Sequence, residues 1–132
     1  MAEGGILTLV SIDRDGCVRL ASNGPITANG SHLLSKNPLE TLLGVTWFSN
    51  RVIIDFSRTD FIDSAAIGWL IGSAREFRVR GGRIAVHSVT PRVRQMLNIL
   101  KIGQLVPLLS DEEAARRFVT EGTTANPLAV GA

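Results

Sequence analysis

The chain has almost no cysteine, no long apolar run and no basic leader. Its one cysteine, Cys17, cannot form a disulfide within the chain and is not a metal site by itself, so the reducing cytoplasm fits best. No stretch approaches the roughly 18 to 20 apolar residues that a membrane-spanning helix needs. The first five residues lack the basic region of a secretory signal. We therefore expect a cytoplasmic protein that is neither secreted nor inserted into a membrane.

The chain also lacks a large excess of positive or negative charge. Lys and Arg number 14 and Asp and Glu 12, and the net charge of +2 is too small to indicate a nucleic-acid partner. The basic run from Arg75 to Arg94 is most simply explained as a solvated rim. With 132 residues, 45% of them hydrophobic, the chain is expected to form one compact domain.

The residue patterns of catalysis and metal binding are missing as well. His32 and His87 are far apart, with no cysteine or carboxylate cluster at ligand spacing. The glycine-containing stretch 24–29 lacks the Gly-Lys-Ser/Thr ending of a phosphate-binding loop, and no Ser/His/Asp spacing stands out. We expect no metal, no cofactor and no enzymatic activity, and a small nucleotide-binding or hydrolytic enzyme is the least supported alternative.

Strand and helix signals alternate along the chain. Apolar alternation over 6–12 and 17–20 around a turn predicts a β-hairpin, and the run Val52-Ile53-Ile54 predicts a strand that is buried on both faces. Capping and apolar spacing predict helices over 37–44, over 64–79 and from Thr90-Pro91 onward. A short helix around 31–35, a strand over 83–87, a short strand near Leu105 and a last helix capped by Ser110 complete the order.

This order predicts an α/β fold. We expect a single domain with a mixed, mostly parallel sheet of four to five strands that starts with a hairpin, and about four helices. Residues 1–121 are expected to form the domain, and residues 122–132, which are small and polar without periodicity, a flexible C-terminal tail.

The most informative segment runs from Asp55 to Leu70, where a buried strand leads through an acidic loop into a helix. It places the hydroxyl of Ser64 at the helix start. Unpaired N–H groups and a partial positive charge at that end stabilise a phosphate. Serine and aspartate are also the commonest capping residues, so the position suits a plain cap for either Ser64 or Asp63. The residues leave both roles open.

The helix that follows has a predicted buried stripe and an opposite face. The stripe consists of Ala66, Ile67, Leu70, Ile71, Ala74 and Phe77. Trp69 falls nearly opposite, together with Ala65, Gly72 and Glu76. An exposed tryptophan beside small residues suits a protein interface, and packing under a neighbouring loop is the alternative.

The segment resembles the serine loop of the STAS domain, the family of bacterial anti-sigma factor antagonists. The pattern is Asp55-Phe56-Ser57, then Phe61-Ile62-Asp63-Ser64, then Ile67-Gly68 and Leu70, and the element order agrees over nearly the whole chain. In that family the serine directly after the aspartate is phosphorylated by a partner that is both serine kinase and anti-sigma factor. The unmodified protein binds this partner and frees a sigma factor, and phosphate breaks the complex.

The resemblance implies a role for each residue of the segment. Ser64 is the expected phosphorylation site, and Asp63 is expected to help hold the serine loop or to orient the kinase chemistry. The expected partner-binding residues are Asp63, Ser64, Ala65, Trp69, Gly72 and Glu76, and Asp60 and Thr59 are expected to support the loop. Ser57 and Thr59 are expected as turn formers rather than phosphosites. A serine phosphatase is a further candidate partner, and a monomer or weak dimer is expected.

The sequence departs from the family pattern at two places. Ala65 and Ala66 stand where a second hydroxyl residue and a glycine are common, and Pro38 interrupts a segment that usually forms one longer helix. These departures motivate an alternative, a constitutive STAS scaffold or transporter-associated module that binds a partner without phosphorylation.

Overall fold

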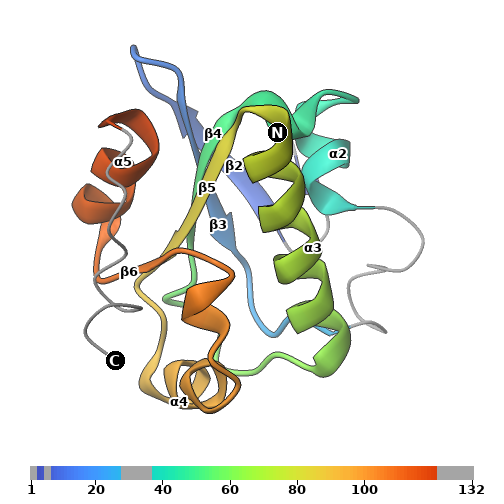
Figure 1. Ribbon diagram of the computed structural model, residues 1–132, viewed down its shortest axis with the longest axis vertical. Helices are drawn as coiled ribbons and strands as arrows, with labels where there is room; N and C mark the ends of the chain where they lie inside the picture. The colour runs from blue at the N-terminus through green and yellow to red at the C-terminus, as the bar shows by residue number, and fades with distance from the viewer. Residues whose placement is uncertain (1–2, 5–6, 28–36, 122–132) are drawn as a thin grey trace.

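A six-stranded sheet in sequential order lies at the centre of the computed structural model, which describes residues 3–4, 7–27 and 37–121 (Figure 1). β2 (Leu7–Ile12) and β3 (Cys17–Ser22) form the antiparallel hairpin. β3, β4 (Arg51–Asp55), β5 (Arg83–His87) and β6 (Leu108–Leu109) then run parallel. β1 (Glu3–Gly4) adds a two-residue strand beyond β2.

Helices cover both faces of this sheet, which explains why the β4 residues Val52, Ile53 and Ile54 are all buried. The larger core lies under α2 (Pro38–Leu43), α3 (Ser64–Arg80) and α4 (Pro91–Ile99). α5 (Glu112–Glu121) covers the smaller core on the opposite face, around Cys17 and Ile53. Figure 1 shows α5 on one side of the strands and α2 and α3 on the other.

The predicted fold class is confirmed: a single α/β domain with a mixed, mostly parallel sheet that starts with a hairpin. The described part has six strands rather than four to five because two-residue strands, β1 and β6, lie at its edges. Among the described residues no helix is long and apolar enough to cross a bilayer. The predicted short helix at 31–35 and the predicted tail at 122–132 lie outside the described residues.

Two local predictions were wrong. The short strand lies at Leu108–Leu109 rather than near Leu105, because a 3-10 turn, η2 (Ile102–Gln104), continues the chain after α4. The last helix is capped by Asp111, whose Oδ1 accepts from Ala114 N at 2.8 Å, and not by Ser110. Aspartate is as good an N-cap as serine, so two adjacent capping residues left the start of α5 ambiguous by one position.

Candidate functional site

The loop 56–63 leaves the carboxyl end of β4, next to the centre of the sheet. Asp55 accepts a hydrogen bond from Ser57 N through Oδ1 at 2.7 Å, and Thr59 N donates to Phe56 O at 3.0 Å. The two bonds form tight turns that redirect the chain from the strand toward α3. In sheets of parallel strands, binding sites commonly lie at the carboxyl ends of the strands, so this loop is well placed for function.

Thr59 lies buried beneath the loop and connects it to neighbouring segments by hydrogen bonds. Its side chain is fully buried, and its Oγ1 donates to Gly24 O at 2.9 Å and hydrogen-bonds with the hydroxyl of Ser22. Its carbonyl oxygen accepts from Thr90 Oγ1 at 3.1 Å, at the start of α4. Thr59 thus joins the end of β3, the loop and α4. Of the two residues predicted to support the loop, Thr59 is buried beneath it and Asp60 is exposed at its surface. Their supporting role stays a prediction.

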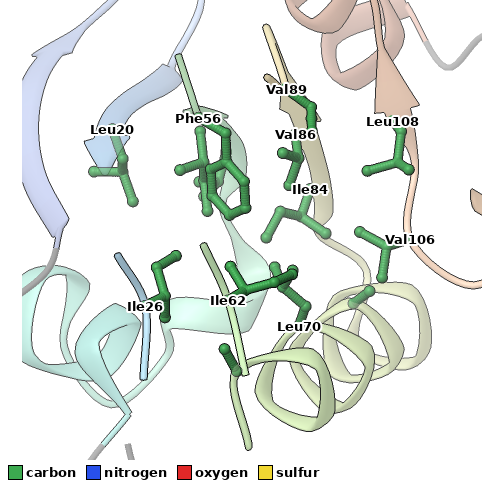
Figure 2. Packing of buried hydrophobic residues seen from close by; sticks show 14 of the residues in the cluster. Leu20, Ile26, Phe56, Ile62, Leu70, Ile84, Val86, Val89, Val106 and Leu108 are labelled. Carbon is green, nitrogen blue, oxygen red and sulfur yellow. The ribbon is translucent and has the colours of Figure 1, made fainter. Parts of the chain in front are cut away.

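A short parallel bridge between Ile26 and Ile62 fixes the last residues before α3. Ile26 N donates to Phe61 O at 3.0 Å, and Asp63 N donates to Ile26 O at 3.2 Å. Both isoleucine side chains are fully buried, and Figure 2 shows them entering the core between the sheet and Leu70 of α3. The backbone at the start of α3 is therefore held by the segment after β3 as well as by its own loop.

Asp63 is the N-cap of α3, and Ser64 is its first helical residue. The Oδ1 of Asp63 accepts from Ala66 N at 2.9 Å, while the Ser64 side chain is exposed and makes no hydrogen bond within the described part of the chain. The capping role left open for Ser64 is therefore filled by Asp63. The Ser64 hydroxyl is therefore accessible at the helix start, where the first-turn backbone N–H groups of Ser64 and Ala65 have no partner within the helix.

The outward face of α3 differs from the predicted one. The buried residues are Ala66, Leu70, Ser73, Ala74 and Phe77, whereas Ile67 and Ile71 are only half-buried. The exposed stripe opposite them consists of Ser64, Gly68, Gly72, Arg75 and Val79. Of the residues expected on the partner face, Gly72 lies on this stripe, and Ala65, Trp69 and Glu76 lie half-buried on its flank. Glu76 forms an ion pair with Arg80 at 3.6 Å.

Trp69 is half-buried rather than exposed, because the start of α2 lies against it. Its Nε1 donates to Asn37 Oδ1 at 2.9 Å. The same oxygen caps α2 by accepting from Leu39 N at 2.9 Å, and Asn37 Nδ2 donates to Ser73 Oγ at 3.3 Å. The expectation of an exposed tryptophan is corrected: Trp69 joins α2 to α3, and only part of its ring reaches the surface. Its predicted contact with a partner stays a prediction.

Sequence reasoning missed two kinds of site residue. Gly68 and Arg75 belong to the exposed stripe, and counting in threes and fours from Ser64 would have found them. Ile26 supports the loop through a contact between segments that are distant in the sequence, and no local signal marks it.

Two other reactive side chains within the described ranges, His87 and Cys17, are buried. His87 hydrogen-bonds through Nδ1 with Ser88 Oγ at 2.9 Å, and burial lowers its pKa below the ordinary value. Burial, with the charges of Asp13 and Asp15, raises the pKa of Cys17 to about 11. His32 lies outside the described residues. Within the described ranges, no three His, Cys, Asp or Glu side chains gather as metal ligands.

The chain belongs to the STAS domain family, whose pattern matches residues 8–115. An anti-sigma F factor antagonist of Paenibacillus polymyxa is 24% identical over 62 residues. That alignment covers 47% of this chain and 53% of the relative, so the chain matches about half the length of that curated protein.

Three solved structures show the same fold. A candidate anti-sigma factor antagonist of Thermotoga maritima has a TM-score of 0.70 at 21% identity, with 83% of this chain and 91% of that one covered. Bacillus SpoIIAA in its phosphorylated form has a TM-score of 0.57 at 22% identity (84% and 97% covered). A sulfate transporter family protein of Wolinella succinogenes has a TM-score of 0.64 at 17% identity (93% of each). At these identities the likeness establishes the fold.

Proposed function

We propose that this protein is an anti-sigma factor antagonist. It is a cytoplasmic, non-enzymatic regulator that binds a serine-kinase anti-sigma factor and is switched off by phosphorylation of Ser64. The observation that carries the proposal is that capping residue and exposed hydroxyl are two different residues at the start of α3. Asp63 caps the helix, and Ser64 next to it is exposed with a free hydroxyl. Family membership and the partial match to an anti-sigma F factor antagonist support it.

The electrostatics of the loop give the switch its physical basis. A phosphate on Ser64 would add about −1.5 to −2 charges to a surface that already carries Asp60 and Asp63. The first-turn N–H groups of α3 stabilise that charge, so the domain tolerates the modification without unfolding. A partner that fits the neutral serine instead meets an anion at the centre of the contact. A buried mismatch of this kind costs several kcal/mol, which is enough to break the complex.

The test incubates this protein with ATP and with its cognate serine-kinase anti-sigma factor. Intact-mass measurement should show one added phosphate on the wild type and on a Ser57→Ala control, which removes an exposed hydroxyl of the same loop. Ser64→Ala should stay unmodified. Ser64→Asp should bind the kinase at least about tenfold more weakly, a loss of about 1.4 kcal/mol. Equal modification of Ser64→Ala would refute the proposal.

A second function is favoured by one specific observation, the fold likeness to a sulfate transporter family protein. A constitutive STAS module would bind its partner through the same face of α3 without a phosphate switch. Ala65, half-buried beside Ser64, removes one alternative hydroxyl and fits that reading. In this case a partner captured by the wild type would be captured equally by Ser64→Asp, whereas the switch requires the loss of binding.

A further inference from the structure

Five arginines lie at the end of the molecule farthest from Ser64. β3, β4 and β5 begin in register at Cys17, Arg51 and Arg83, so their first residues share one end of the sheet. α3 ends there as well, directly before β5, and the tip of the β2–β3 hairpin projects beside it (Figure 1). We call this surface the arginine end, and it consists of Arg14, Arg51, Arg78, Arg80 and Arg83, all of them exposed.

The positive charge of the arginine end is largely uncompensated. Within the described residues Arg80 forms an ion pair with Glu76 at 3.6 Å, and the other four arginines of this surface make no ion pair. The acidic side chains of the hairpin are already occupied. Asp13 pairs with Arg19 at 3.7 Å, and Asp15 pairs with Arg116 at 3.5 Å. The end therefore presents a concentrated positive field although the whole chain carries only +2.

At this end of the sheet, two of these arginines do not favour folding. Arg51 and Arg83 are directly opposite each other in the register of β4 and β5, and like charges in that position are destabilising. An anion placed between them would turn the repulsion into attraction. Guanidinium groups bind phosphate oxygens in a bidentate manner, which makes phosphate the anion that arginine recognises best.

Exposed aliphatic side chains accompany the arginines. Ile12 at the end of β2 is 60% exposed, Val45 is 77% exposed and Val79 is 65% exposed. Val45 belongs to this end because the following 3-10 turn, η1 (Trp47–Ser49), packs against the end of α3. Phe48 of η1 lies 5.0 Å beneath the Arg80 guanidinium. Single-stranded nucleic acid binds to exposed aromatic rings on which its bases stack. The nearby rings of Trp47 and Phe48 are half-buried, so this surface does not suit such a ligand.

We propose that the arginine end docks on an anionic phospholipid surface. The arginines bind the lipid phosphates, and Ile12, Val45 and Val79 reach into the boundary of the acyl chains, the combination that characterises interfacial membrane binding. The surface lies at the opposite end of the 17-residue helix α3 from Ser64, about 25 Å away along the axis. The domain is thus able to sit on a membrane and present its serine loop to a partner at the same time. This inference goes beyond the proposed function and does not depend on it.

Co-sedimentation with vesicles tests the proposal. The wild-type protein should bind vesicles of phosphatidylcholine and phosphatidylglycerol, and not phosphatidylcholine alone, and binding should weaken as salt is raised. Each arginine near a charged membrane is worth about fivefold in affinity. The Arg51→Glu/Arg83→Glu double variant should therefore lose more than about twentyfold. This variant keeps like charges opposite each other across the two strands, so its folding is perturbed little; Arg51→Gln/Arg83→Gln provides a second, milder variant.

The matched control is Arg92→Glu/Arg94→Glu, which reverses two charges on α4 at the other end of the molecule. It should bind mixed vesicles as the wild type does, and so should Ser64→Asp, which separates this inference from the phosphorylation switch. Equal loss in the Arg92/Arg94 variant would reveal diffuse attraction and overturn the proposal, as would failure to bind the mixed vesicles. Tighter binding to duplex DNA or to polyglutamate than to vesicles would assign the surface to a nucleic acid or an acidic protein instead.

Discussion

At the scale of single residues, the sharpest constraint is Gly82, between α3 and β5. A Cβ at this position would collide with the backbone oxygen of Phe48 and lie 2.5 Å from that of Asn50. The Asn50 oxygen is held in place because Arg83 N donates to it at 3.0 Å, and both colliding atoms belong to the backbone rather than to the end of a flexible side chain. Gly82→Ala should therefore lower the free energy of unfolding by about 2–3 kcal/mol, measured by urea denaturation.

Gly68→Ala is the matched control for this prediction. Gly68 lies on the exposed stripe of α3, and a Cβ there meets nothing within 4 Å. Alanine is the better helix former by up to about 1 kcal/mol, so this change should raise stability. If Gly82→Ala proved as stable as the wild type, the close approach of the 48–50 backbone would be refuted.

Of the pair Gly81-Gly82, one glycine is predictable from the local sequence and the other is not. Gly81 has a φ of +94°, the left-handed conformation that ends helices, and a glycine in that position is readable from the sequence. The need for Gly82 depends on a contact with residues more than thirty positions earlier, and no local pattern records it. Ser64 follows the same logic. Its place at the helix start was predictable, but its freedom from the capping role required the Asp63 geometry.

At the scale of elements, the Asn37 side chain links α2 to α3 through its hydrogen bonds with Trp69 and Ser73. Asn37→Ala would remove the cap of α2 and leave Trp69 Nε1 without its acceptor. A lost cap costs about 1 kcal/mol, and an unpaired, partly buried donor adds to it. We expect a loss of about 1–2 kcal/mol in urea denaturation. In a Trp47→Phe background, the fluorescence of Trp69 should shift to longer wavelength as water reaches the indole.

Asn37→Asp is the informative companion, because its carboxylate still caps α2 and still accepts from Trp69. It should recover most of the lost stability and the native fluorescence. Trp69→Phe should keep the packing and lose only the hydrogen bond, so its effect should nearly vanish in the Asn37→Ala protein. Additive losses in that double variant would contradict a direct coupling of the two helices.

The sequence predicts the ends of helices better than their faces. Asn37-Pro38 and Thr90-Pro91 are local start signals, and α2 and α4 begin where they indicate. The buried face of α3 was partly wrong because apolar residues surround its first two turns. Ala65, Ala66 and Ile67 are consecutive and cover most directions of the helix, so spacing alone does not settle which side packs. The contact of Trp69 with α2 settles it.

At the scale of the whole molecule, the alternation of strands and helices was enough to predict the sheet and its mostly parallel direction. Two features needed the structure. The edge strands β1 and β6 have only two residues each and carry no periodicity. The two cores are unequal, and in the described part of the chain α2, α3 and α4 lie over one face and α5 over the other. Which face a helix covers is decided by packing between distant segments, which leaves little trace in local sequence.

Because the sheet is buried on both faces, His87 is buried as well, and this makes the stability of the fold depend on pH. This side chain lies in β5 on the face that α5 covers, and burial lowers its pKa below the value of 6.5 found in an unfolded chain. Asp55, Asp111 and Glu112 oppose this effect, and Arg19 adds to it, but burial is the largest cause. The histidine is thus held neutral in the fold, while the unfolded chain takes up a proton as the pH falls through 6.5.

The unfolded state therefore binds more protons below pH 6.5, and stability must fall from there toward the lower pKa of the folded state. The slope for one proton is at most about 1.4 kcal/mol per pH unit. Urea denaturation at pH 7.5, 6.5 and 5.5 measures it, in a His32→Gln background so that His87 is the only histidine. His87→Gln should flatten the dependence over this range, whatever its effect on absolute stability, because carboxylates titrate lower, near pH 4. An unchanged slope in that variant would show that a group other than His87 makes the fold sensitive to acid.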